Sequence, residues 1–121
     1  FFTVSSIDSS SLLFKRNSYE LKDSIGFHAI LSFLKQNQAL KIMVIGTSKE
    51  KEYQKPNRPK WLEKPTDSIL VKYAENKMDN LAGYRALYIT RKFIANGIEP
   101  NRIHVAIKNG PRAAVRFKIV Q

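Results

Sequence analysis

Residues 80–100, NLAGYRALYITRKFIANGIEP, constrain the fold of this chain more than any other part of its sequence. Gly97 can take the left-handed conformation that closes a helix, and Pro100 lies just beyond it, so the helix should end near Asn96. Apolar residues recur before this stop at three- and four-residue steps, which predicts a helix with one broad apolar face: Leu81, Tyr84, Leu87, Tyr88, Ile89, Phe93 and Ile94.

Arg85 is the residue of this helix with the clearest potential for binding. It is followed directly by Ala86, and a small residue beside a cation leaves space for an anionic group to approach. The competing interpretation is an arginine on the helix surface, paired with a nearby acid and contributing little to stability.

Four segments have the apolar patterns of strands. Residues 12–14 form a short apolar run, and residues 39–46 are almost continuously apolar, as in a strand covered on both faces. Residues 103–108 and 113–120 alternate between apolar and polar side chains. The pair Asn109-Gly110 between them favours a tight turn, so the last two strands are predicted to form an antiparallel hairpin.

Two further segments are helical in pattern. One begins at Ser18 or Tyr19, with Ser18 as its cap, and continues to about Gln36. The other begins in the cluster Thr66-Asp67-Ser68, which resembles a helix N-cap. The sequence leaves open whether this second segment joins the helix of residues 80–96 or breaks near Asp79.

Residues 49–65, KEKEYQKPNRPKWLEKP, are too rich in proline and mixed charge for a continuous helix or a central strand. A loop this long in a small domain is usually functional or disordered. Arg58, Lys60 and Trp61 make it a candidate docking loop, because a tryptophan in a free loop would remain exposed.

The resulting order is strand, helix, strand, long loop, helix, strand, strand. Its expected architecture is α+β, a two-layer sandwich with two main helices packed on one mixed sheet. At 121 residues the chain has room for one domain, placed at residues 12–121, with residues 1–11 as a linker or edge segment. No apolar run is long enough to cross a bilayer, and we expect any membrane anchor to lie outside this segment.

The formal charge of +11 favours anionic partners: nucleic acid, acidic lipid, an anionic cell-wall polymer or an acidic protein. No constellation of catalytic residues or glycine-rich phosphate loop is present, and there is no cysteine. His28 and His104 have no partner at a ligand spacing. We therefore expect no enzyme activity, no metal and no cofactor.

Several segments together resemble the OmpA-like, peptidoglycan-associating domain of outer-membrane porins, envelope lipoproteins and flagellar stator proteins. Residues 12–21 resemble its opening strand and turn, residues 41–48 its second strand, and residues 114–120 its closing strand. The most specific likeness is Asn80-Leu81-x-x-x-Arg85-Ala86 followed by Gly97-Ile98-x-Pro100-x-Arg102-Ile103. The resemblance covers most of the chain and implies the same two-layer fold.

The resemblance also implies a binding site for the diaminopimelate group of the peptidoglycan stem peptide. In that family an arginine takes a carboxylate and an aspartate pairs with the ammonium. Arg85 matches the arginine, but the aspartate position falls on Ser48, which carries no charge. Asp79, Asp67 or a loop glutamate would have to replace it, and Arg16 stands where an aromatic residue is usual. Thr47 and Asn80 complete the expected site, with strand-end and helix caps as their alternative roles.

The predicted function is a non-catalytic envelope module in the periplasm, associated with the outer membrane of a Gram-negative bacterium. Its expected partners are peptidoglycan, bound weakly because the acid is missing, or other proteins of an assembly such as a secretion system or motor. The alternative is a basic α/β domain that binds nucleic acid, suggested by the charge and by Tyr53, Arg58 and Trp61 in one loop. That alternative lacks a paired-aromatic strand motif, so nucleic acid is not the expected partner.

Overall fold

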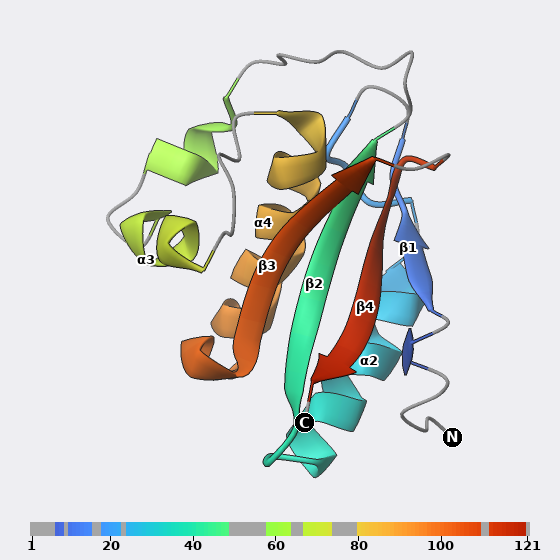
Figure 1. Ribbon diagram of the computed structural model, residues 1–121, viewed down its shortest axis with the longest axis vertical. Helices are drawn as coiled ribbons and strands as arrows, with labels where there is room; N and C mark the ends of the chain where they lie inside the picture. Colours follow the sequence, from blue (N-terminus) through green and yellow to red (C-terminus); the bar gives the residue numbers. More distant parts are fainter. Residues whose placement is uncertain are drawn as a thin grey trace.

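A computed structural model of the chain describes residues 7–8, 10–15, 18–22, 24–48, 58–63, 67–73, 80–109 and 112–120. These form two layers, with one four-stranded sheet in front and helices behind it (Figure 1). The elements run β1(Ser11–Leu13), α2(Ser24–Gln36), β2(Lys41–Ser48), η1(Lys60–Glu63), α3(Asp67–Lys72), α4(Leu81–Ala95), η2(Pro100–Arg102), β3(Ile103–Asn109) and β4(Ala114–Val120). The predicted α+β sandwich on a mixed sheet is confirmed. In the described part of the chain, no helix has the length and apolar character needed to span a membrane.

The predicted hairpin between the last two strands is wrong. The strand order is β1-β4-β2-β3, so β2 lies between β3 and β4. β2 pairs with β3 in parallel and with β4 in antiparallel orientation. The local turn signal at Asn109-Gly110 was misleading because β2, an apolar strand without acidic residues, occupies the centre of the sheet and needs a neighbour on both sides.

β3 and β4 lie on opposite sides of β2, so the connection from β3 to β4 passes the end of β2. Thr47, near that end, binds the backbone just before β4 and at its first residue. Its hydroxyl lies 2.8 Å from the carbonyl oxygen of Arg112 and 3.0 Å from that of Ala114, and it donates to both. Asn109 is paired with Ser48 and Ala114 with Thr47, so the two strands that β2 separates are connected at the same end of the sheet. Thr47 is 4% exposed.

Helix α4 packs closely on β2, and two small residues make this possible. A Cβ atom on Gly46 would lie 1.9 Å from the carbonyl oxygen of Ala82 and 3.0 Å from the Cβ of Ala86. Ala86 is fully buried. The small side chain beside Arg85 therefore fills the contact between helix and strand, and it leaves no open space for a ligand at this point.

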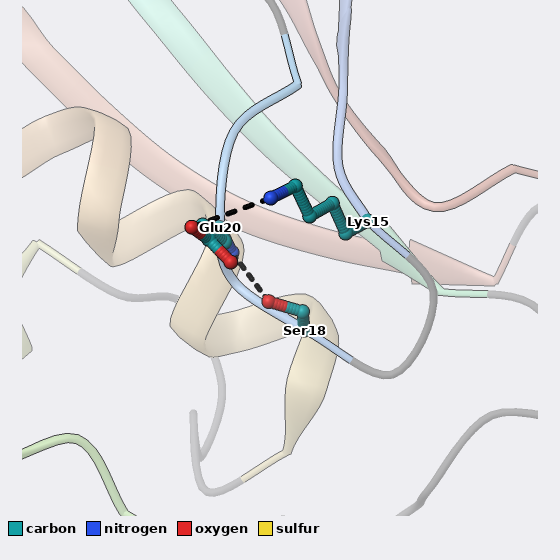
Figure 2. Close-up of polar contacts among 3 residues, drawn as sticks. All are labelled: Lys15, Ser18 and Glu20. Atoms are coloured by element: carbon teal, nitrogen blue, oxygen red, sulfur yellow. Dashed lines mark hydrogen bonds and ion pairs between the residues drawn. The ribbon is translucent and has the colours of Figure 1, made fainter.

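The first helix begins later than the sequence pattern suggests. Residues 18–22 return antiparallel to the end of β1, through a bridge between Phe14 and Leu21, and α2 starts only at Ser24. Ser18 does not cap a helix. Its hydroxyl accepts a hydrogen bond of 2.8 Å from the backbone N–H of Glu20, because serine side chains bond readily to backbone two residues away in turns (Figure 2).

The end predicted for α4 is confirmed, and the structure answers the open question of where this helix begins. Asn80 is its N-cap in an extended conformation, which separates α4 from α3, and Gly97 has a φ of +96° just after the last turn.

β3 is an edge strand of the sheet, and residue 73, after α3, contacts its outer side. The backbone N–H of Val105 donates to the carbonyl of Tyr73 at 2.9 Å. Arg16, Thr66, Asp79 and Gly110, named above for their sequence patterns, lie outside the described residues, as do residues 49–57 and 64–65.

Arg102 is a buried arginine that closes the C-terminal end of α2. Its guanidinium donates to the carbonyls of Leu34, Asn37 and Leu40 at 2.8 to 3.0 Å. The last carbonyls of a helix lack partners within the helix, and a cation near them is favoured by the helix dipole. Arg102 thereby fixes η2, and with it the start of β3, against the end of α2.

Candidate functional site

Arg85 occupies the centre of the candidate site. It lies in the first half of α4, faces the end of β2, and its side chain is 0% exposed. Its Nε–H donates to the carbonyl of Ser18 at 2.7 Å. One terminal nitrogen donates to the carbonyl of Thr47 at 3.0 Å, and the other to that of Lys15 at 3.3 Å. The guanidinium carbon lies 5.7 Å from the ring centre of Phe14.

The surface-arginine interpretation is therefore wrong. Arg85 is buried, and three of its donor groups hold backbone carbonyls from the loop after β1 and from the end of β2. A buried guanidinium is stable only when its donors are satisfied, because leaving one unpaired costs about 1–3 kcal/mol or more. The planar fork of arginine suits this task because it donates in several fixed directions at once.

The residues after β1 that Arg85 holds, described at positions 15 and 18–20, are also fastened by their own contacts. The N–H of Lys15 donates to the carbonyl of Glu20 at 3.0 Å, and the N–H of Ser18 to the carbonyl of Lys15 at 3.1 Å. At the surface, Lys15 Nζ pairs with Glu20 Oε1 at 3.4 Å (Figure 2). Both side chains of this ion pair are more than half exposed, so it contributes little. The buried guanidinium is the stronger of the two restraints on these residues.

The structure gathers Thr47, Ser48 and Arg85 at one end of β2, with Asn80 at the start of α4 nearby in the chain. Thr47 offers its carbonyl to Arg85 and uses its hydroxyl at the crossing to β4. Ser48 is half-buried and follows that carbonyl directly. Asn80 acts as a cap, since its Oδ1 accepts from the N–H of Gly83 at 2.8 Å.

Replacing Asn80 with alanine should lower the free energy of unfolding by about 1 kcal/mol, because the Gly83 N–H loses its acceptor. Asn80→Asp keeps an oxygen in the same position and should retain most of the stability. Chemical denaturation of both variants checks this. Equal losses in the two variants would show that the cap is not what Asn80 supplies.

The three residues proposed for a docking loop differ in their exposure to solvent. Arg58 and Lys60 are exposed, whereas Trp61 is half-buried in η1. The indole lies edge-on to Tyr19 at 6.2 Å and tilted to Tyr88 at 6.1 Å between ring centres. The guanidinium of Arg91 lies 5.6 Å from it. Trp61 thus anchors η1 to α4 and to the loop after β1, as the argument against a free tryptophan indicates.

Sequence reasoning missed the acceptors of Arg85, since backbone carbonyls leave no trace in residue identity. One signal was available: Gly46 and Ala86 are small residues in a strand and a helix that otherwise pack large side chains, which favours close approach of the two elements. Within the described ranges, no three side chains of the acidic, histidine or cysteine types are gathered to hold a metal ion.

Comparison with solved structures identifies the fold. The peptidoglycan-associated lipoprotein of Burkholderia pseudomallei superposes with a TM-score of 0.59 and 14% identity, over 91% of this chain and 89% of that one. The C-terminal domain of Helicobacter pylori MotB gives a TM-score of 0.57 and 14% identity, over 93% and 84%. The OmpA-like domain of FopA1 from Francisella tularensis gives 0.49 and 16%, over 92% and 72%, and this TM-score is too low to support an argument.

The chain therefore has the OmpA-like fold, as the motif resemblance implies. At this level of identity the likeness shows the fold alone. No protein-family model matches the sequence, and no curated protein sequence matches it significantly.

Proposed function

We propose that this chain is a non-catalytic envelope module of OmpA-like type that acts in the periplasm of a Gram-negative bacterium. The fold supports this proposal, and the name of one structural neighbour, a peptidoglycan-associated lipoprotein, supports peptidoglycan as the general kind of partner. We further propose that its grip on the stem peptide is weak, and that its main role is structural, as a subunit of an envelope assembly.

The burial of Arg85 supports the proposal that the stem peptide is bound weakly. A guanidinium that receives a ligand carboxylate needs free donors and a path from solvent. Arg85 is 0% exposed, and it already donates to the carbonyls of Lys15, Ser18 and Thr47. A carboxylate would have to displace the carbonyls of Lys15, Ser18 or Thr47 to reach it. Ser48, at the position of the expected acid, adds no charge for an ammonium group.

Calorimetric titration with a stem peptide that contains diaminopimelate tests this proposal. We expect no saturable heat at physiological salt, because neither charged group of the zwitterion finds an accessible partner. On purified sacculi we expect retention that disappears as salt is raised, since net charge alone acts through screened, long-range attraction.

Saturable peptide binding by the unmodified chain that survives physiological salt would contradict the weak-grip form. It would also mean that an acidic residue elsewhere in the chain pairs with the ammonium group.

The nucleic-acid alternative loses part of its support in this structure. It relied on Trp61 as a stacking residue in a basic loop. Trp61 instead packs against Tyr19 and Tyr88, with Arg91 over its ring.

A further inference from the structure

The sheet has one face that no described helix covers, here called the open face. Gly46 points toward α4, so alternation along β2 places Lys41, Met43, Ile45 and Thr47 on the opposite side. Figure 1 shows this side toward the viewer, with α2 and α4 behind the sheet. Residues that pair on neighbouring strands lie on the same face of a sheet, so the register identifies the open-face residues of the other three strands.

Positive charge gathers on the open face. Register places Lys118 opposite Met43, Arg116 opposite Ile45 and Lys108 opposite Thr47. With Lys41 this makes four exposed cations on one face. The four strands contain no aspartate or glutamate. Asp8 lies beside β4, where its carboxylate accepts from the N–H of Ile119 at 2.8 Å.

Aliphatic side chains lie among these cations. Leu13, opposite Ala114, is 43% exposed, and Val120, opposite Lys41, is 37% exposed. Among the described strand residues, the aromatic side chain on this face is the exposed imidazole of His104, opposite Met43, since Phe117 pairs with Val44 on the helix side. The open face therefore combines exposed cations with exposed aliphatic groups.

These features favour one kind of anionic partner over others. Single-stranded nucleic acid is held on sheets by stacking on several aromatic side chains, whereas the described part of this face offers His104 and no Phe, Tyr or Trp. The core of a protein interface is usually depleted of lysine, because its ammonium is strongly hydrated. A lipid headgroup layer leaves lysine and arginine hydrated and still attracts them, by about 1 kcal/mol for each residue near the surface.

We propose that the open face is a docking surface for a bilayer that carries anionic phospholipids. Lys41, Lys108, Arg116 and Lys118 are attracted to phosphate groups, while Leu13 and Val120 contact the headgroup boundary. Neighbouring strands are about 4.8 Å apart and alternate residues about 6.6 Å, so several cations can meet the surface together. This inference does not rest on the proposed function, because it uses neither Arg85 nor peptidoglycan.

Vesicle co-sedimentation at physiological salt tests the docking surface. One vesicle preparation contains phosphatidylcholine and phosphatidylglycerol in equal parts, and the other contains phosphatidylcholine alone. The whole chain should sediment with the first and remain in solution with the second. The double variant Arg116→Gln with Lys118→Gln should partition about thirty-fold more weakly, from the loss of two surface cations.

A matched control changes the net charge equally away from the open face. Lys35 and Lys72 are exposed in the last turns of α2 and α3, and replacing both with glutamine should weaken partition by about threefold or less, since the remaining effect is long-range. The variant Lys41→Gln with Lys108→Gln provides a second test on the open face. Unchanged thermal midpoints confirm that all variants are folded.

Three results would overturn the proposal. One is an equal loss of vesicle partition in the open-face and control variants, which would indicate that net charge, and not the open face, drives the binding. Another is equal partition onto phosphatidylcholine alone. The third is binding to polyaspartate or to a single-stranded oligonucleotide at the same salt without binding to the anionic vesicles, which would assign the face to an acidic protein or a nucleic acid.

Discussion

Gly46→Ala is expected to lower the free energy of unfolding by about 3 kcal/mol, and the thermal midpoint by about 10 °C. The added methyl would lie 1.9 Å from the carbonyl oxygen of Ala82. That oxygen belongs to the backbone of α4, so the clash is relieved only if the helix moves away from β2. Such a movement would loosen the buried contact around Ala86 and change the position of Arg85 relative to the end of the strand.

Gly26→Ala is the matched control, because its added methyl would also meet a close neighbour. Here the neighbour is the Cδ2 atom of Leu12, 2.8 Å away, at the end of a side chain that can rotate. Alanine also favours the helix by roughly 1 kcal/mol over glycine, so little net loss is expected. Thermal denaturation compares the two. Similar midpoints for both variants would contradict the close packing of α4 on β2.

Arg85→Met should destabilise the fold by about 3 kcal/mol, because it removes the donors of one buried and two part-buried carbonyls and keeps the volume similar. The carbonyls of Lys15, Ser18 and Thr47 would each lose a partner. Arg85→Lys should recover only part of this, since an ammonium cannot reach all three positions that the guanidinium fork reaches. Urea denaturation measures the differences.

A merely stabilising side chain would affect the whole fold evenly, whereas the geometry of Arg85 predicts a local effect as well. Exchange of the backbone amides of Lys15 and Ser18, which are hydrogen-bonded beside Arg85, should accelerate more than exchange in α2. Arg116→Met, on the exposed face of β4, is the control and should change stability by less than about 0.5 kcal/mol. Uniform acceleration throughout the chain would contradict a clamp on these residues.

Local patterns in the sequence located the main helices and strands of this fold, although not all of their limits. The apolar period and the Gly97 stop predicted the end of α4, and the apolar run at residues 39–46 predicted a strand, which is β2. The order of strands was not accessible in the same way. Asn109-Gly110 is a strong local turn signal, but pairing in a sheet is decided by contacts between distant segments, and β2 takes both neighbours.

The motif directed attention to Arg85, but the sequence did not indicate which groups its side chain contacts. The structure places Arg85 at the end of β2, beside Thr47. Which groups its guanidinium meets depends on backbone carbonyls brought from far along the chain, and residue identity carries no information on these. The late start of α2 has the same origin, because the Phe14–Leu21 bridge replaces the first helical turns that the apolar spacing suggested.

The most direct test of a structural rather than ligand-binding Arg85 is the solvent exchange of its Nε–H, followed by nuclear magnetic resonance with and without a stem peptide that contains diaminopimelate. We expect slow exchange, because this proton is buried and donated to the Ser18 carbonyl at 2.7 Å, and we expect no change on addition of the peptide. Rapid exchange, or a saturable shift of this signal with the peptide, would contradict the structural role and show that Arg85 serves a ligand.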